Sequence, residues 1–130
     1  MTAKEYLMQY RQSMERTAEI EQHLAELKAE AIRLKDHEGQ SVKLDDATAK
    51  YVDACDEMSA ELTRLHDLRE EIKRTIEAVP NARFRNMLTE IYMGGQTLVR
   101  IAADKNYSYE HICRLHGEAL RLVSEIMPKT

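Results

Sequence analysis

The sequence predicts an all-α protein in which a long antiparallel helical hairpin precedes a small domain of shorter helices. Charged residues make up 32% of the 130 residues and aromatic residues only 5%, which is typical of long helices. Neither Gly nor Pro occurs between Ala3 and Leu34. Two segments repeat apolar or small residues at alternating steps of three and four, which is the spacing of a heptad seam. These observations together define the predicted hairpin.

The first helix of the hairpin is predicted over residues 3–34. The segment that follows, 36–44, is polar, contains Gly39 and lacks any period, so we predict a loop there. The seam of the first helix consists of Tyr10, Ser13, Thr17, Ile20, Leu24, Leu27, Ala31 and Leu34.

The second helix is predicted to begin after Asp45, which can cap it, and to end before Pro80. Its seam has one polar member, Arg69, for which the neighbouring Leu68 can substitute. Residues 1–79 are therefore predicted to form an antiparallel coiled-coil hairpin. The second seam consists of Tyr51, Cys55, Met58, Leu62, Leu65, Arg69, Ile72, Ile76 and Val79.

A two-helix pair leaves apolar residues outside its seam. This surplus predicts a further partner, most simply a second copy that completes a four-helix bundle. We therefore expect a homodimer through the coiled coil, although the same small residues also fit a seam that is merely wider. The residues expected outside the seam are Leu7, Met14, Ala47, Ala54 and Leu68.

Residues 80–130 are predicted to form a separate domain in which the heptad stops. Asn81 can cap a first helix that ends at Gly94 and Gly95, and Thr97 can cap a short helix over 98–105. Asn106 can adopt the left-handed conformation of a tight turn, and Ser108 can cap a last helix over about 109–127. A short helix, a turn of three or four residues and a longer helix is the order of a helix-turn-helix.

The segment RNMLTEIYMGGQTLVRIAADKNYSYEHICRLHGEAL resembles region 4 of the bacterial sigma factors over about residues 82–127. The whole chain, with its coiled-coil front half and its RLHGEAL ending, is similar to small phage and prophage proteins of unassigned function, and to the ArpU and RinA groups of phage late-gene regulators. The resemblance implies a DNA-binding transcription regulator with RNA polymerase as a possible partner. The matching frame is Tyr92, Gly95, Ile101, Ala102, Ser108, Ile112, Leu115, Ala119 and Leu120.

A recognition helix that begins after Ser108 would present its N-terminal residues to the base edges. Arg114 can bind guanine with two hydrogen bonds, and Glu110 can accept one from cytosine. Phosphate oxygens are expected to be bound from the turn and from the preceding helix. The predicted DNA-binding residues are Arg100, Lys105, Ser108, Tyr109, Glu110, His111, Cys113 and Arg114.

The recognition helix also contains three potential metal ligands, His111, Cys113 and His116. Because a helix turns about 100° per residue, one ion cannot reach all three, and only the spacing of Cys113 and His116 suits a helical pair. We predict no metal, no cofactor and no enzymatic activity, because no phosphate-binding loop or oriented nucleophile is evident. Gly117 is interpreted as a packing notch where another helix approaches closely.

The formal net charge is −4, and it is unevenly spread. Residues 1–79 contain 12 Lys and Arg against 18 Asp and Glu, whereas residues 80–130 contain 7 against 5, so the C-terminal part is where an anion would bind. Neither a signal peptide nor a run of about 20 apolar residues is evident, so we expect a cytoplasmic protein without a membrane segment.

Two other functions fit the same pattern. The last helix can bind RNA polymerase or another protein without reading DNA, and the chain can be a DNA-packaging component of the small-terminase type. Salt-dependent duplex binding separates the first alternative from a DNA-reading regulator, and a ring of many subunits would favour the second.

Overall fold

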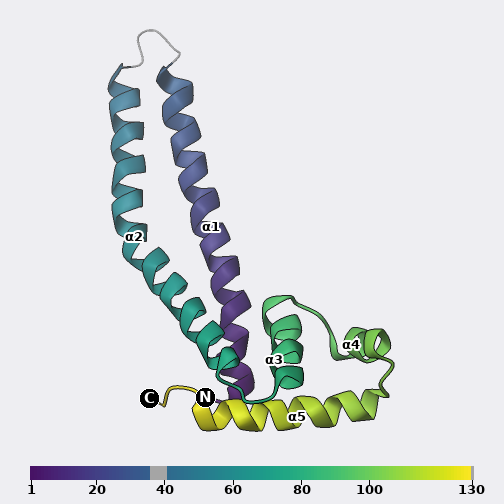
Figure 1. Cartoon of the computed structure of the whole chain (residues 1–130). Coiled ribbons are helices and arrows are strands. Elements are labelled where there is room, and N and C mark those ends of the chain that lie inside the picture. The colour runs from purple at the N-terminus through teal and green to yellow at the C-terminus, as the bar shows by residue number, and fades with distance from the viewer. Residues whose placement is uncertain (36–40, 130) are drawn as a thin grey trace. The chain divides into compact units, whose positions relative to one another are not determined.

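The computed structural model describes residues 1–35 and 41–129, apart from the side chain of Ser41 (Figure 1). These residues contain helices and turns and no strand, so the predicted all-α class is confirmed. No helix in these ranges is both long enough and apolar enough to cross a membrane. The elements are α1 (Ala3–Lys35), α2 (Ser41–Glu77), α3 (Ala82–Leu88), a π-helical segment over Thr89–Met93, α4 (Leu98–Lys105) and α5 (Tyr109–Ile126).

The start of α2 corrects the predicted loop. Residues 41–44 belong to the first turn of α2, so Asp45 lies inside the helix and does not cap it. The physical reason is that residues 41–79 contain neither Gly nor Pro, so no helix-breaking residue opposes a start at Ser41. The rest of the predicted loop, residues 36–40, lies outside the described residues.

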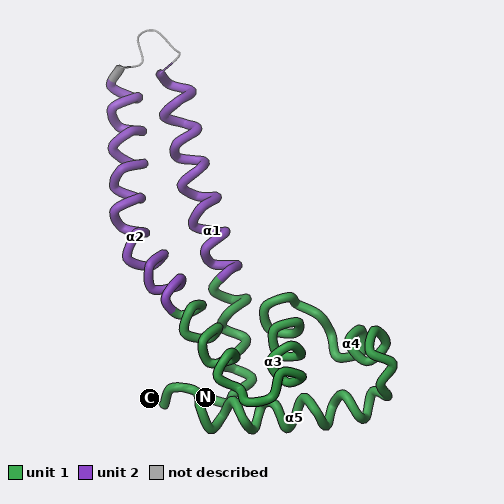
Figure 2. Tube along the Cα trace, in the orientation of Figure 1, with its two compact units in different colours: residues 1–13, 68–130 green, residues 14–67 purple. Residues whose placement is uncertain are grey.

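The chain forms two compact units, which we call unit 1 and unit 2 (Figure 2). Unit 1 comprises residues 1–13 and 68–130, and unit 2 comprises residues 14–67. The sequence suggested a division at residues 79 and 80 instead. The difference arises because the first turns of α1 and the last turns of α2 share a hydrophobic core with α3, α4 and α5.

The core of unit 1 draws on every helix that enters the unit. Leu7 of α1 and Val79, just after α2, are fully buried, as are Leu88 of α3 and Val123 of α5, and Ile101 of α4 is 2% exposed. Burial of such side chains is the main favourable contribution to folding. The residues that sequence reasoning assigned to a hairpin and to a separate domain are therefore held by one core.

Within unit 1, a polar contact accompanies this core. The Tyr6 hydroxyl donates a hydrogen bond to Oε2 of Glu71 at 2.9 Å and shares another with Oγ1 of Thr75 at 3.0 Å. Burial raises the pKa of the Tyr6 phenol to about 12. These bonds satisfy the one polar atom of a side chain that is 5% exposed, so Tyr6 fixes the start of α1 against α2.

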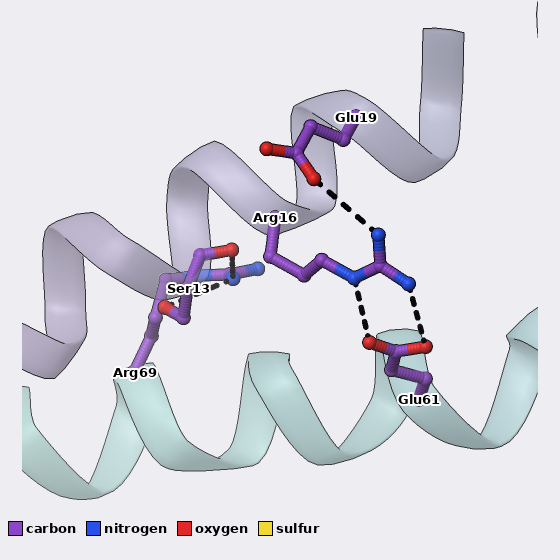
Figure 3. A network of polar contacts seen from close by, with 5 residues as sticks. All are labelled: Ser13, Arg16, Glu19, Glu61 and Arg69. Atoms are coloured by element: carbon purple, nitrogen blue, oxygen red, sulfur yellow. Dashed lines mark hydrogen bonds and ion pairs between the residues drawn. The ribbon is translucent and has the colours of Figure 1, made fainter. Parts of the chain in front are cut away.

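The structure also explains why Arg69 occupies a seam position. Its Nη1 donates to the backbone oxygen of Ser13 at 3.2 Å and lies 3.3 Å from Oγ of the same residue (Figure 3). The Ser13 hydroxyl in turn donates to the backbone oxygen of Tyr10 at 2.8 Å. A guanidinium group that finds its acceptors at one place on α1 favours one register of α1 against α2 in unit 1.

Unit 2 consists of the remaining parts of α1 and α2. Its helices run antiparallel (Figure 1), and Arg16 of α1 is paired with Glu61 of α2. Arg16 binds both carboxylate oxygens of Glu61, at 2.8 and 3.3 Å, and also reaches Glu19 at 3.3 Å (Figure 3). In this unit only Ile20, Leu34, Ala47 and Ala54 are buried among the apolar residues that the structure describes.

The predicted surplus of exposed apolar residues is mostly absent. Leu7 is fully buried in unit 1, Ala47 and Ala54 are each 8% exposed in unit 2, and Leu68 is half-buried. Met14 alone of the five is exposed, at 47%. The expectation was wrong for Leu7 because the C-terminal helices, which hairpin geometry ignores, cover that face of α1.

Candidate nucleic-acid interface

The segment from α4 to α5 is built by local capping interactions. Oγ1 of Thr97 accepts a hydrogen bond from the amide of Arg100 at 3.1 Å, and Oγ of Ser108 accepts one from the amide of His111 at 3.1 Å. Between the helices, Asn106 has φ 57° and ψ 38°, in the left-handed region. The two predicted caps and the predicted left-handed residue are confirmed. Together they join α4 to α5 through a three-residue turn.

Packing fixes the two helices against the core of unit 1. Ala102 of α4 is 5% exposed, and its small side chain suits the place where α4 meets α5. On α5, Ile112, Leu115, Ala119 and Val123 are buried at steps of three and four. The opposite face of α5 is therefore the one that remains available to a ligand.

The outer face of α5 is polar. Glu110, Arg114, Gly117, Glu118 and Arg121 are exposed and follow one another at intervals of one to four residues along this face. Arg121 is paired with Glu125 at 3.2 Å. Within the described part of the chain, Arg114 has no such partner, so its guanidinium is available for an external acceptor.

The eight predicted DNA-binding residues differ in how far they are accessible. Six are exposed and two, His111 and Cys113, are half-buried. Arg100 lies 3.7 Å from Asp104 in an exposed pair, which contributes little to stability and leaves the cation available. The six exposed residues are Arg100, Lys105, Ser108, Tyr109, Glu110 and Arg114.

The two half-buried residues contact tyrosines. The His111 ring packs edge-on against Tyr107, with 4.9 Å between ring centroids. The Cys113 thiol forms a hydrogen bond with Tyr109. This bond is the main cause that raises the pKa of the Tyr109 phenol, and the charge of Cys113 is the second cause. His111 and Cys113 thus orient neighbouring aromatic rings, and the exposed residues remain the better ligands for an anion.

Arg83 is not among the eight predicted DNA-binding residues. In the structure the Arg83 guanidinium lies over the Tyr107 ring, 5.7 Å from its centroid. Arg83 is exposed, so it adds a cation beside the turn between α4 and α5. No sequence signal indicated this contact, because 24 residues separate the two side chains and their spacing follows no repeat.

His116 belongs to the core side of α5. Its Nε2 lies 2.8 Å from the Tyr92 hydroxyl, and the two rings stack with centroids 5.9 Å apart. Burial, and then the charge of Lys4, lowers the pKa of His116. Burial also raises the pKa of Tyr92 to about 12. In residues 1–35 and 41–129 no three His, Cys, Asp or Glu side chains converge as a metal site would require.

We expect the protein to lose stability as the pH falls below about 6.5, the ordinary pKa of histidine. The folded-state pKa of His116 is lowered, so the unfolded chain takes up the proton first. The stabilisation is therefore present above the unfolded pKa and is lost as the pH falls through the folded pKa. Thermal unfolding between about pH 7.5 and pH 5.5 measures the slope of stability against pH, and His116→Gln should make that slope smaller. An unchanged slope in the variant would assign the effect to other groups.

Gly117 is not a packing notch. A Cβ atom built on it would meet no atom within 4 Å, apart from its own helix backbone and chain neighbours. The expectation of a close helix was wrong, because Gly117 lies on the outer face of α5 with Arg114. A glycine at an exposed helical position weakens the helix, and here no close packing contact within the chain compensates for that loss.

Replacing Gly117 with alanine is therefore expected to stabilise the protein by about 0.5–1 kcal/mol, because alanine restricts the unfolded chain and clashes with nothing. Urea unfolding followed by circular dichroism measures the change. Gly95→Ala is the matched contrast, because Gly95 has φ +72° and its added Cβ would meet the Arg11 side chain. Loss of stability in Gly117→Ala would mean that some contact needs the glycine.

The two units differ strongly in charge. Unit 1 contains 12 Lys and Arg against 9 Asp and Glu, a balance of +3, whereas unit 2 contains 7 against 14, a balance of −7. An anionic ligand is therefore attracted to unit 1, which contains α4 and α5, and repelled by unit 2.

A scan of protein-family models, a search of curated proteins and a search of solved structures each found no match.

Proposed function

We propose that this protein is a DNA-binding transcription regulator of the phage type, and that α5 reads the major groove. The observation that carries the proposal is the capped α4–turn–α5 segment. It exposes Arg114 on the first half of α5, and Arg114 makes no ion pair with any residue that the structure describes. Helix-turn-helix proteins read base edges with this part of their second helix. The positive balance of unit 1 supports the same role.

The chemistry divides between bases and phosphates. Arg114 binds O6 and N7 of guanine, and Glu110 accepts a hydrogen bond from N4 of cytosine. Arg100, Lys105 and Tyr109 bind phosphate oxygens and fix the register of α5 on the duplex. Ser108 contributes as well, because its Oγ accepts the capping hydrogen bond from His111 while its hydroxyl hydrogen remains free to donate.

The finer architecture is part of this proposal. In this proposal residues 1–79 form a coiled-coil hairpin, and α3 to α5 form a domain like region 4 of the sigma factors. The resemblance adds a cytoplasmic location and RNA polymerase as a further partner. Transcription activation or repression then follows from where the protein binds relative to a promoter.

The test is to mix the protein with sheared DNA from its source genome at near-physiological salt and to sequence the retained fragments. We expect a sharp peak near a block of genes. Even retention across the genome, or none, would overturn the proposal of sequence reading. A titration with salt on the enriched fragment should show affinity falling steeply, as counterion release requires.

Protein docking is the second candidate for the same surface. Val99 of α4 is 66% exposed and Tyr109 is 55% exposed, and protein interfaces cover apolar side chains and tyrosine rings of this kind. RNA polymerase is the partner to test. Binding of purified polymerase that Val99→Asp abolishes, together with no retained DNA, would favour this function over DNA reading.

A further inference from the structure

The helices of unit 2 have a second row of residues beside the seam. Each of its members follows a seam residue directly, so it points about 100° away from the seam. On α1 this row includes Ala18 after Thr17, and Ala25 after Leu24. On α2 it includes Val52 after Tyr51.

Geometry places both rows on the same side of unit 2. The two helices run in opposite directions, and their seams face each other. A rotation of 100° in the chain direction is clockwise on one helix and anticlockwise on the other when both are viewed from one end. Because the seams point in opposite directions at the start, the two rotations turn both rows toward one common face. We call it the second face.

The second face has fewer charges than the opposite side of unit 2, and it has several exposed apolar or small side chains. Met14 is 47% exposed, Ile32 54% and Val52 49%. Ala18 and Ala25 are exposed between them. The charged residues of this row are Glu21, Lys28 and Lys35 on α1 and Asp56 on α2. A row of exposed apolar and small side chains of this kind is typical of an interface rather than of a face in permanent contact with water.

The opposite side of unit 2 is built for solvent. Residues that directly precede the seam, at Arg16, Glu19, Glu30, Arg33 and Glu61, form ion pairs with one another. All of these pairs lie on the side away from the second face. The contrast between a side with ion pairs and a side with Met, Ala, Val and Ile makes the helix pair as a whole amphipathic.

We propose that the second face binds a second copy of this chain, with α1 packed antiparallel against the partner's α1 about a two-fold axis at Ala25. This inference goes beyond the proposed function and does not rest on DNA binding. A two-fold axis at this position makes the surface complementary to itself, as an isologous interface requires.

Charge and size both fit that axis. Antiparallel pairing centred at Ala25 brings Glu21 beside Lys28 of the partner subunit, offset by one residue, and Lys28 beside the partner's Glu21. Neither side chain has an ion-pair partner within the described residues of its own chain. The same pairing brings the small Ala18 opposite the large Ile32 of the partner, and two alanines at the axis allow the helices to approach closely.

The available area is sufficient for a specific dimer. From Met14 to Ile32, α1 is about 27 Å long, and two adjacent helices are about 20 Å wide. The interface would then bury about 1,100 Å² in total, just above the roughly 1,000 Å² that separates specific interfaces from incidental contacts. An interface of this size is expected to dissociate at measurable concentrations, which makes it open to titration.

Sedimentation equilibrium of the whole chain, without DNA, tests the proposal. We expect a mass of twice 15.1 kDa that falls on dilution. Ala25→Glu should raise the dimer dissociation constant more than about tenfold, because it places two like charges at the axis. His23→Glu is the matched control, since His23 is exposed on α1 and directly precedes the seam residue Leu24, on the side away from the second face. Circular dichroism checks that both variants remain helical.

A charge exchange tests the pairing itself. Glu21→Lys and Lys28→Glu should each weaken the dimer, and the double variant should restore it, because each partner then again presents opposite charges. A monomer at all concentrations would overturn the proposal, as would a dimer unaffected by Ala25→Glu. Failure of the double variant to restore the dimer would overturn the antiparallel α1 pairing. None of these results depends on whether the protein reads DNA.

Discussion

Arg114→Ala is expected to weaken binding to the preferred DNA site by about 1–3 kcal/mol and to relax its sequence preference at one base pair. The side chain is exposed on the outer face of α5 and makes no ion pair within the described residues, so its removal leaves the fold unchanged. The affinity for random duplex DNA should fall far less. Fluorescence anisotropy with both duplexes at one salt concentration measures the difference.

Arg121→Ala is the matched control for this prediction. Arg121 is exposed on the same helix, but it lies about two turns further along and is paired with Glu125 at 3.2 Å. We expect its removal to leave the preference for the specific site unaltered. An equal loss of affinity for specific and random DNA in Arg114→Ala would reduce Arg114 to a phosphate contact.

The parts of the structure that depend on neighbouring residues could be predicted from the sequence. Thr97 and Ser108 cap helices, and Asn106 takes a left-handed conformation, because each side chain satisfies or permits backbone geometry within three residues. The capped α4–turn–α5 segment, and the exposure of Arg114 on it, therefore follow from local rules. The same holds for Asn81, whose side chain accepts from the amides of Arg83 and Phe84.

The parts that depend on distant packing could not be predicted. Leu7 was expected on the surface because a hairpin alone offers nothing to cover it, and only the folded C-terminal helices do so. Gly117 was assigned to packing because a helical glycine usually has a structural reason, yet the sequence does not state which face of α5 is open. Tyr92 and His116 are 24 residues apart, and their spacing does not predict the 2.8 Å contact between the Tyr92 hydroxyl and Nε2 of His116.

Arg69 is intermediate between the features that the sequence could predict and those that it could not. Its place in the seam was visible in the sequence as an exception to the apolar pattern. The acceptors of its Nη1, the backbone oxygen and hydroxyl of Ser13, lie 56 residues away on α1, so only the structure could identify them. A polar residue in an apolar repeat thus indicates a contact without identifying its partner.

Leu7→Ala is expected to destabilise unit 1 by about 2–5 kcal/mol, because Leu7 is fully buried and its truncation leaves a cavity. The consequence should extend to α5, since Leu7 and Val123 belong to the same hydrophobic core. Hydrogen exchange of the α5 amides should therefore accelerate in the variant, although more than 100 residues separate the two positions.

Met8→Ala is the adjacent control. Met8 is 42% exposed on the next position of α1, so its truncation should change the free energy of unfolding by less than about 1 kcal/mol. If α5 keeps its full protection in Leu7→Ala while α1 loses its own, the C-terminal helices fold independently of α1. The division at residue 79 that the sequence suggests would then describe the protein better than the shared core does.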